Sequence, residues 1–313
     1  MHKDIRLKNW WSRKEVSAGR KRLKLTWWIY KHFGIFPIKI LSFFLTCGAF
    51  IFVKDIKIYS KKYFKILYKY TNNPKYKPTY LNSFKHILSY SNSLVDKMLA
   101  YSDNYKNIKF NTPKDAETIK TLIQNKQGAF FLTNHIGSIE MLRAFMESGF
   151  VPKVKINVFL QQSQCKIFNE FINSISTQQN YIETFPVEDI NIETAIEIKE
   201  RINNGEFVFM AGDRISKNSP SKTYETKFLG EIIHLPLGAI KFALLLDCPI
   251  YLTICPIIKK DYTMFLKNIE LEEDKKSNLE KIKQEYSKYL EYSTLKFPYQ
   301  FYNFYDIFEE SNV

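Results

Sequence analysis

The chain has 313 residues, 45% of them hydrophobic, so it can bury a substantial core in one large domain or two small ones. Its 46 Lys and Arg against 32 Asp and Glu give a net charge of +14, which favours anionic partners such as lipid headgroups, acidic carrier proteins or nucleic acid. Because Lys predominates over Arg and no helix-turn-helix, zinc-finger or RNA-binding signature is present, we expect no nucleic-acid partner. The cysteines lack Cys-x-x-Cys spacing and paired histidines, which argues against a disulfide framework and a metal site: Cys47, Cys165, Cys248 and Cys255.

The N-terminal region combines tryptophan, basic residues and an apolar run. All four Trp lie near the N-terminus, and residues 33–53 read FGIFPIKILSFFLTCGAFIFV, about the length that a membrane span requires. Pro37, Lys39 and Gly48 interrupt this run, and basic residues flank it on both sides, so the positive-inside rule gives no orientation. We predict that residues 1–75 form a membrane-anchoring region, either a single span or a helix in the cytoplasmic leaflet; the alternative is a buried helix of a soluble domain.

Strand and helix patterns alternate through residues 76–313, after a proline-containing loop at residues 71–82. This alternation predicts one α/β domain with a mostly parallel central sheet flanked by helices. The predicted strands are 128–134, 153–160, 206–214 and 248–258. The predicted helices are 83–108, 113–126, 138–148, 165–176, 193–205 and 238–247, with a polar loop at 215–228.

The segment LTNHIGSIE, residues 132–140, follows a buried strand and carries the candidate catalytic pair. His135 and Glu140 lie on different faces of a regular helix, so we expect His135 in the turn before the helix and Glu140 in its first turn, with Ser138 as the N-cap. A carboxylate beside a histidine fixes the tautomer and stabilises the imidazolium, which suits a general base. Asn134 is predicted to bind the substrate. For this motif taken alone, the alternative is a histidine that is hydrogen-bonded at a strand end and has no catalytic role.

The pattern N-H-x-x-x-x-E resembles the first motif of the lysophospholipid acyltransferase superfamily, and more closely that of the lipid A lauroyl/myristoyl acyltransferase branch. The N-terminal Trp/Arg-rich stretch is also similar. Further matching stretches are VFMAGDRIS (208–216), TKFLGEIIHLPLGAIKFALLLDCPIYLTICPI (226–257) and PYQFYNFYDIF (298–308). The resemblance therefore extends over nearly the whole chain.

The resemblance implies an acyltransferase at the cytoplasmic face of the bacterial inner membrane. The donor would be a fatty acyl thioester on acyl-carrier protein or coenzyme A, and the acceptor a hydroxyl or amine of a membrane lipid or glycolipid. His135 would act as the general base with support from Glu140, and no cofactor or metal would be needed because the thioester is already activated. One departure concerns the acceptor: Gln161 and Gln162 stand where the lipid A enzymes are expected to carry an arginine, which implies a branch with another acceptor.

Three further residues are predicted to bind the substrate. Asp213 at a strand end can orient the acceptor or bind a backbone amide, and Arg214 can pair with a phosphate or carboxylate; a structural ion pair is the alternative for both. Gly238 allows close approach of the backbone to the acyl thioester, with helix N-terminal amides near the oxyanion, or is simply a glycine at a helix start.

Other functions are compatible with these motifs. A non-catalytic lipid- or membrane-surface-binding protein of the same fold, or a thioester hydrolase, would share the motifs. The aromatic C-terminus is expected to pack as core, with a bilayer or acyl-channel surface as the alternative.

Overall fold

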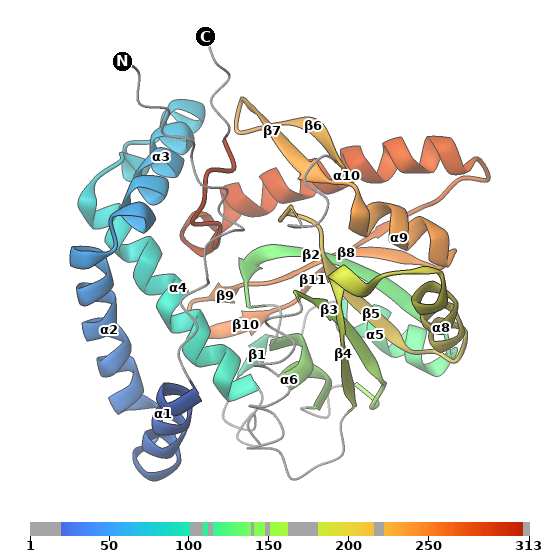
Figure 1. The fold of residues 1–313 in the computed structure, drawn as a ribbon, viewed down its shortest axis with the longest axis horizontal. Helices are drawn as coiled ribbons and strands as arrows, with labels where there is room; N and C mark the ends of the chain where they lie inside the picture. Colours follow the sequence, from blue (N-terminus) through green and yellow to red (C-terminus); the bar gives the residue numbers. More distant parts are fainter. Residues whose placement is uncertain are drawn as a thin grey trace.

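A central six-stranded sheet organises the chain (Figure 1). The computed structural model describes residues 20–100, 109–111, 115–138, 141–147, 151–161, 181–215 and 222–308. The strand order is β11-β8-β2-β5-β3-β4, and all neighbours are parallel except the edge strand β11, which runs antiparallel to β8. The strands are β2 (Ala129–Gly137), β3 (Ile156–Leu160), β4 (Ile182–Pro186), β5 (Phe207–Ala211), β8 (Ile250–Cys255) and β11 (Phe265–Ile269). The prediction of a mixed α/β fold with a mostly parallel sheet is confirmed.

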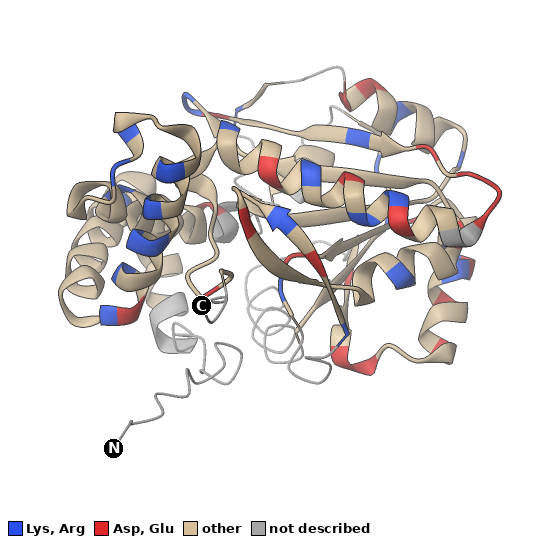
Figure 2. Ribbon diagram, turned by 90° about the horizontal axis from the view of Figure 1, so that it is seen from above, with Lys and Arg blue, Asp and Glu red and all other residues tan. Residues whose placement is uncertain are grey.

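Four helices at the N-terminal side stand beside this sheet (Figure 1). They are α1 (Arg20–Phe33), α2 (Ile35–Phe52), α3 (Lys54–Thr71) and α4 (Tyr80–Ala100), with the short 3-10 helix η2 (Pro74–Tyr76) before α4. Among the described residues, α2 alone is long and apolar enough to cross a membrane by length and composition, which is weak evidence for an anchor. Figure 2 shows Lys and Arg spaced along these helices, with few acidic positions among them.

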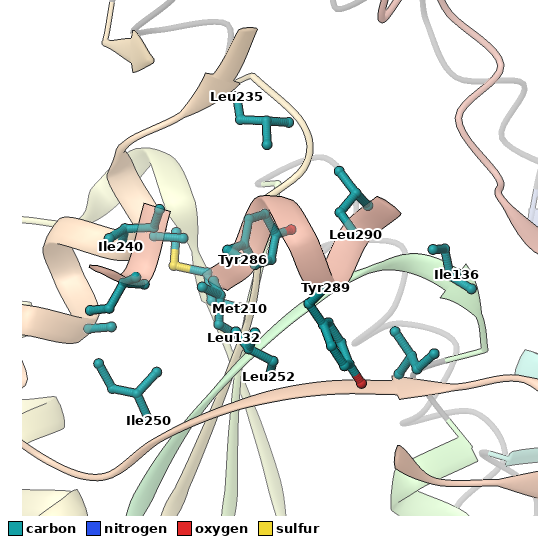
Figure 3. Packing of buried hydrophobic residues seen from close by; sticks show 14 of the residues in the cluster. Leu132, Ile136, Met210, Leu235, Ile240, Ile250, Leu252, Tyr286, Tyr289 and Leu290 are labelled. Carbon is teal, nitrogen blue, oxygen red and sulfur yellow. The ribbon is translucent and has the colours of Figure 1, made fainter. Parts of the chain in front are cut away.

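The two faces of the sheet carry separate cores because side chains alternate along β2. Phe130 and Leu132 face α8, α9 and α10, whereas Ala129 and Phe131 face α5 and α6. Figure 3 shows the first core, in which Leu132 lies among side chains from α9 and α10. The helices are α5 (Asp115–Gln124), α6 (Met141–Glu147), α8 (Ile192–Asn203), α9 (Gly238–Leu246) and α10 (Lys275–Lys296). A buried run such as FFLT is typical of a central parallel strand covered on both sides.

Several smaller elements complete the description. They are β1 (Phe110–Asn111), β9 (Ile257–Ile258), β10 (Asp261–Thr263), the hairpin strands β6 (Thr223–Phe228) and β7 (Glu231–Pro236), and the 3-10 helices η4 (Val187–Asp189) and η5 (Pro298–Gln300). The predicted helix 165–176 lies outside the described residues. The predicted stop of α8 is confirmed, because the helix ends at a turn in which Gly205 has a φ of +86°.

The packing of α3 crosses the predicted division between residues 1–75 and 76–313. Tyr63 and Phe64 are fully buried in the same core as β2 and α10. The Tyr63 hydroxyl donates to the Pro298 carbonyl at 2.9 Å, and Lys62 forms an ion pair with Asp306 at 2.8 Å. The C-terminal segment is therefore held between the N-terminal helices and the sheet, and its aromatic side chains pack largely as core, as expected.

His86 of α4 is one of these buried connections. Its Nε2 lies 2.6 Å from the Phe301 carbonyl oxygen, and its Nδ1 lies 3.1 Å from the Ser60 hydroxyl. Because a carbonyl only accepts, Nε2 carries the proton and Nδ1 accepts from Ser60. Burial lowers the pKa of His86 to about 4, against the smaller opposing effect of its bond to Phe301. The ring is therefore neutral at physiological pH.

This pKa predicts acid sensitivity. Between the unfolded value of about 6.5 and the folded value of about 4, the unfolded chain binds a proton that the folded chain does not. The free energy of unfolding should therefore fall as the pH drops through this window, by up to about 3 kcal/mol from this residue. Urea unfolding at pH 7 and pH 5 measures the loss. The variant His86→Gln should lose less stability over the same interval, and an identical loss in parent and variant would contradict the prediction.

Candidate active site

His135 lies on the last part of β2, where the strand becomes irregular. The register between β2 and β8 shifts between Thr133 and Gly137, and Gly137 has a φ of +73°. A Cβ on Gly137 would overlap the backbone carbonyl of Cys255, so only glycine fits this bend. The expectation that His135 sits in the turn before the helix is therefore not met: the strand continues through it, and a bulge instead of a turn sets its direction.

Asp213 holds His135 by two hydrogen bonds. Its Oδ1 lies 2.8 Å from the His135 Nδ1, and its Oδ2 accepts from the His135 backbone N–H at 2.9 Å. The Asp213 side chain is fully buried, whereas that of His135 is 29% exposed. An ionised carboxylate only accepts, so Nδ1 carries a proton and Nε2 is the ring nitrogen turned away from Asp213.

The pKa of Asp213 keeps it ionised. Burial alone would raise this pKa, but the charge of His135 and the hydrogen bond to its ring, together with the charge of Arg214 and a hydrogen bond from Asn303, outweigh burial and lower it to about 2. The carboxylate is therefore charged throughout the physiological range, and its stabilising contribution is lost only as the pH falls toward 2. Such a buried charge depends on these partners.

The C-terminal segment supplies further bonds around Asp213. Asn303 Nδ2 donates to Asp213 Oδ2 at 2.9 Å, and the Tyr305 hydroxyl donates to the Asp213 backbone carbonyl at 2.8 Å. The backbone N–H of Tyr302 donates to the His135 carbonyl at 2.9 Å. Residues 301–305 thus hold both members of the pair in place. Asn303 and Tyr305 are site residues that sequence reasoning misses; the only signal was the aromatic C-terminal run.

Arg214 binds this same segment. Its Nε donates to Asn303 Oδ1 at 3.1 Å, and its Nη2 donates to the Tyr302 carbonyl at 2.9 Å. The guanidinium therefore orients Asn303, which in turn orients Asp213. Binding of a phosphate or carboxylate by Arg214 stays a prediction.

The remaining predicted residues differ in their position relative to His135. Asn134 is buried beside His135; its Oδ1 accepts from the Ile136 N–H at 3.1 Å, and its Nδ2 has no hydrogen-bond partner in the described part of the chain. Gly238 is exposed at the start of α9 and does not belong to the hydrogen-bond network of His135. Glu140 lies outside the described residues, so its predicted support of His135 stays a prediction.

The described residues contain no group of three or more His, Cys, Asp or Glu side chains that could hold a metal ion. No protein-family model matches the chain, and a search of curated proteins finds no match to its sequence.

The geometry predicts opposite tautomers for two histidines. His135 should carry its proton on Nδ1, which faces the Asp213 carboxylate. His86 should carry its proton on Nε2, which faces the Phe301 carbonyl. Nitrogen-15 NMR of histidine-labelled protein at neutral pH distinguishes the two forms. The variant Asp213→Asn should disturb the His135 signal alone. Glu225→Gln is the matched control, since Glu225 lies 3.9 Å from a partly exposed histidine, His234. An Nε2-protonated His135 in the parent chain would contradict the assignment.

Proposed function

We propose that this protein is an acyltransferase that moves a fatty acyl chain from a thioester to a hydroxyl or amine of a membrane lipid or glycolipid. The observation that carries the proposal is the partly exposed His135 whose Nδ1 is fixed by a buried, ionised Asp213. This arrangement leaves Nε2 as the basic nitrogen, which is the state a general base requires. The resemblance of the motifs to lysophospholipid acyltransferases supports the choice of acyl transfer over other reactions that use a histidine base.

The proposed reaction needs no covalent enzyme intermediate. His135 Nε2 takes the proton from the acceptor as its oxygen or nitrogen attacks the thioester carbonyl carbon. The carbon–sulfur bond then breaks, and the leaving thiolate takes the proton from the imidazolium. The products are an acylated acceptor and a free thiol, and the histidine returns to its starting state.

The neighbouring residues receive supporting roles in this proposal. Asp213 stabilises the imidazolium and holds the ring, so we assign it to positioning instead of the predicted acceptor binding. Asn134 keeps its predicted substrate role, because its buried Nδ2 can donate to the carbonyl oxygen as negative charge develops there. Glu140 keeps its predicted role as a second carboxylate supporting His135.

The donor and the location follow from the resemblance. The thioester would be carried by acyl-carrier protein or coenzyme A, and the enzyme would act at the cytoplasmic face of the bacterial inner membrane. The apolar helix α2 is consistent with such a location. A non-catalytic lipid-binding protein and a thioester hydrolase are the competing functions; neither makes use of both a fixed histidine base and a lipid acceptor.

Acyl transfer in purified membranes tests the proposal. Labelled acyl thioester is supplied, and the lipid product and free fatty acid are measured separately. His135→Ala should lower the rate of acyl-lipid formation by about a hundredfold or more, because a positioned general base contributes about 10² to 10⁴. His234→Ala is the matched control, since His234 is a partly exposed histidine on the β7 hairpin strand, and it should keep the parent rate.

The competing outcomes are distinct. Normal transfer by His135→Ala would overturn the role of the histidine. Free fatty acid as the only product of the parent would indicate a hydrolase. Lipid binding without any acyl transfer from either donor would indicate a non-catalytic protein.

A further inference from the structure

Helix α2 is largely uncovered, and most of its exposed apolar residues share one face, with Leu45 and Phe52 outside it. Phe36, Phe44 and Ile51 are 72%, 65% and 64% exposed. With Ile40 and Phe43 they fall within about 100° of arc around the helix, so they form one stripe. Contiguous exposed apolar surface of this kind marks an interaction site.

The positive charge of the chain is concentrated in the sequence of the N-terminal helices. Residues 20–100 contain sixteen Lys and Arg against two Asp and Glu, a difference of +14, whereas residues 101–313 contain 25 against 28, a difference of −3. The basic excess is therefore a property of the N-terminal helices and not of the sheet domain (Figure 2). A uniformly basic protein would suit many anions, whereas a basic group of helices that also carries an exposed apolar stripe suits an anionic bilayer.

Lysines of α3 reach the aromatic end of the α2–α4 seam. Lys57 Nζ lies 5.4 Å from the ring centre of Phe50, and Lys61 Nζ lies 4.2 Å from that of Tyr80. Both ammonium groups therefore lie over aromatic rings, and lysines beside aromatic side chains are typical of a membrane–water boundary.

The opposite side of α2 is fixed to α4 by polar contacts. The buried positions Ile38, Ser42 and Thr46 follow one line along the helix. Thr46 Oγ1 donates to Ser91 Oγ at 2.8 Å, and Ser42 Oγ donates to the Asn92 side chain at 3.4 Å. These bonds make α2 part of a helical layer and not a free-standing hydrophobic rod.

Helix α4 is fastened in turn to the C-terminal segment. The Tyr299 hydroxyl donates to the Asn82 side chain at 2.8 Å, and the Tyr302 hydroxyl lies 2.9 Å from Ser89 Oγ. If α2 crossed a bilayer, α4 would follow it into hydrocarbon with its serines and asparagines, or the α2–α4 bonds would break. The first event would place the other polar side chains of α4 in hydrocarbon, and the second would leave the seam hydroxyls without partners; both are unfavourable because hydrocarbon offers polar groups no hydrogen-bond partner. The 18 residues of α2 also span only about 27 Å along the axis, slightly less than the roughly 30 Å hydrocarbon core.

We propose that α2 lies in the plane of an anionic lipid leaflet, with its exposed stripe in the acyl region and the lysines of α3 among the headgroups, and that it does not span the bilayer. This docking does not depend on catalysis. If the proposed function also holds, Tyr302 sets the height of the site above the leaflet, because it contacts α4 through its hydroxyl and His135 through its backbone N–H.

Vesicle binding tests the docking surface. The full chain is sedimented with phosphatidylcholine vesicles that contain or lack phosphatidylglycerol. We expect at least about tenfold tighter binding when phosphatidylglycerol is present, weakening with added salt. Phe44→Asp should weaken binding about tenfold or more, because it places a charge in the stripe. Ile192→Asp is the matched control: Ile192 is 80% exposed on α8, and this change should leave binding unaltered. Absence of binding to both vesicles, or equal losses in the two variants, would overturn the proposal.

The in-plane geometry is tested by labelling from one side of the membrane. Phe33→Cys and Lys54→Cys place thiols at exposed positions just before and just after α2. A membrane-impermeant maleimide applied to inverted inner-membrane vesicles should label both variants above the parent chain. Labelling of one variant alone would show that α2 spans the bilayer and would overturn the in-plane arrangement. If the parent chain binds vesicles but transfers no acyl group, that result would count against the proposed function alone.

Discussion

The buried carboxylate of Asp213 is the constraint on which the site depends. A charge in a protein interior is unfavourable unless it is paired and hydrogen-bonded, and here the ring and backbone of His135 and the amide of Asn303 donate three hydrogen bonds to it. Those donors come from β2 and from the C-terminal segment, while Asp213 itself follows β5. The same bonds that make the charge tolerable therefore also draw three distant parts of the chain together and fix the direction of the His135 ring.

The C-terminal segment links this site to the N-terminal helices. Phe301 pairs with Ile136 in a β-bridge on one side and accepts a hydrogen bond from His86 of α4 on the other. Movement of α4 would therefore be transmitted to β2 through the backbone of Phe301. In the proposed account this connection has a purpose, because α4 carries α2 and its apolar stripe, and the histidine must face a substrate that stays in the membrane. The fold connects the Asp213–His135 pair to the exposed apolar stripe of α2 through these contacts.

Local patterns predicted much of this fold. The buried run FFLT, the Asn204-Gly205 stop and the alternation of strands with helices are properties of neighbouring residues, and they identified β2, the end of α8 and the fold class. Helix α10 was not identified, because its buried positions include tyrosines, Tyr286 and Tyr289, spread among lysines and glutamates. The hairpin strand β6 was predicted as loop since it reads TYETKF, a polar sequence on a two-stranded ribbon.

The sequence identified individual residues of the site but not which of them contact one another. His135 and Asp213 both stood out at strand ends, yet they are 78 positions apart, and only the parallel pairing of β2 with β5 brings them together. Asn303 carried no signal beyond its place in the aromatic C-terminal run. Its role arises because the chain returns to β2 after α10, which no short pattern encodes.

Lipid mass spectrometry of cells tests the central claim most directly. Cells that produce the intact chain are compared with cells that produce the Asp213→Asn variant at equal protein level. If the Asp213–His135 pair drives acyl transfer, a lipid heavier by one acyl chain should accumulate with the intact protein and be nearly absent with the variant. The same acylated lipid at equal abundance in both would contradict the account.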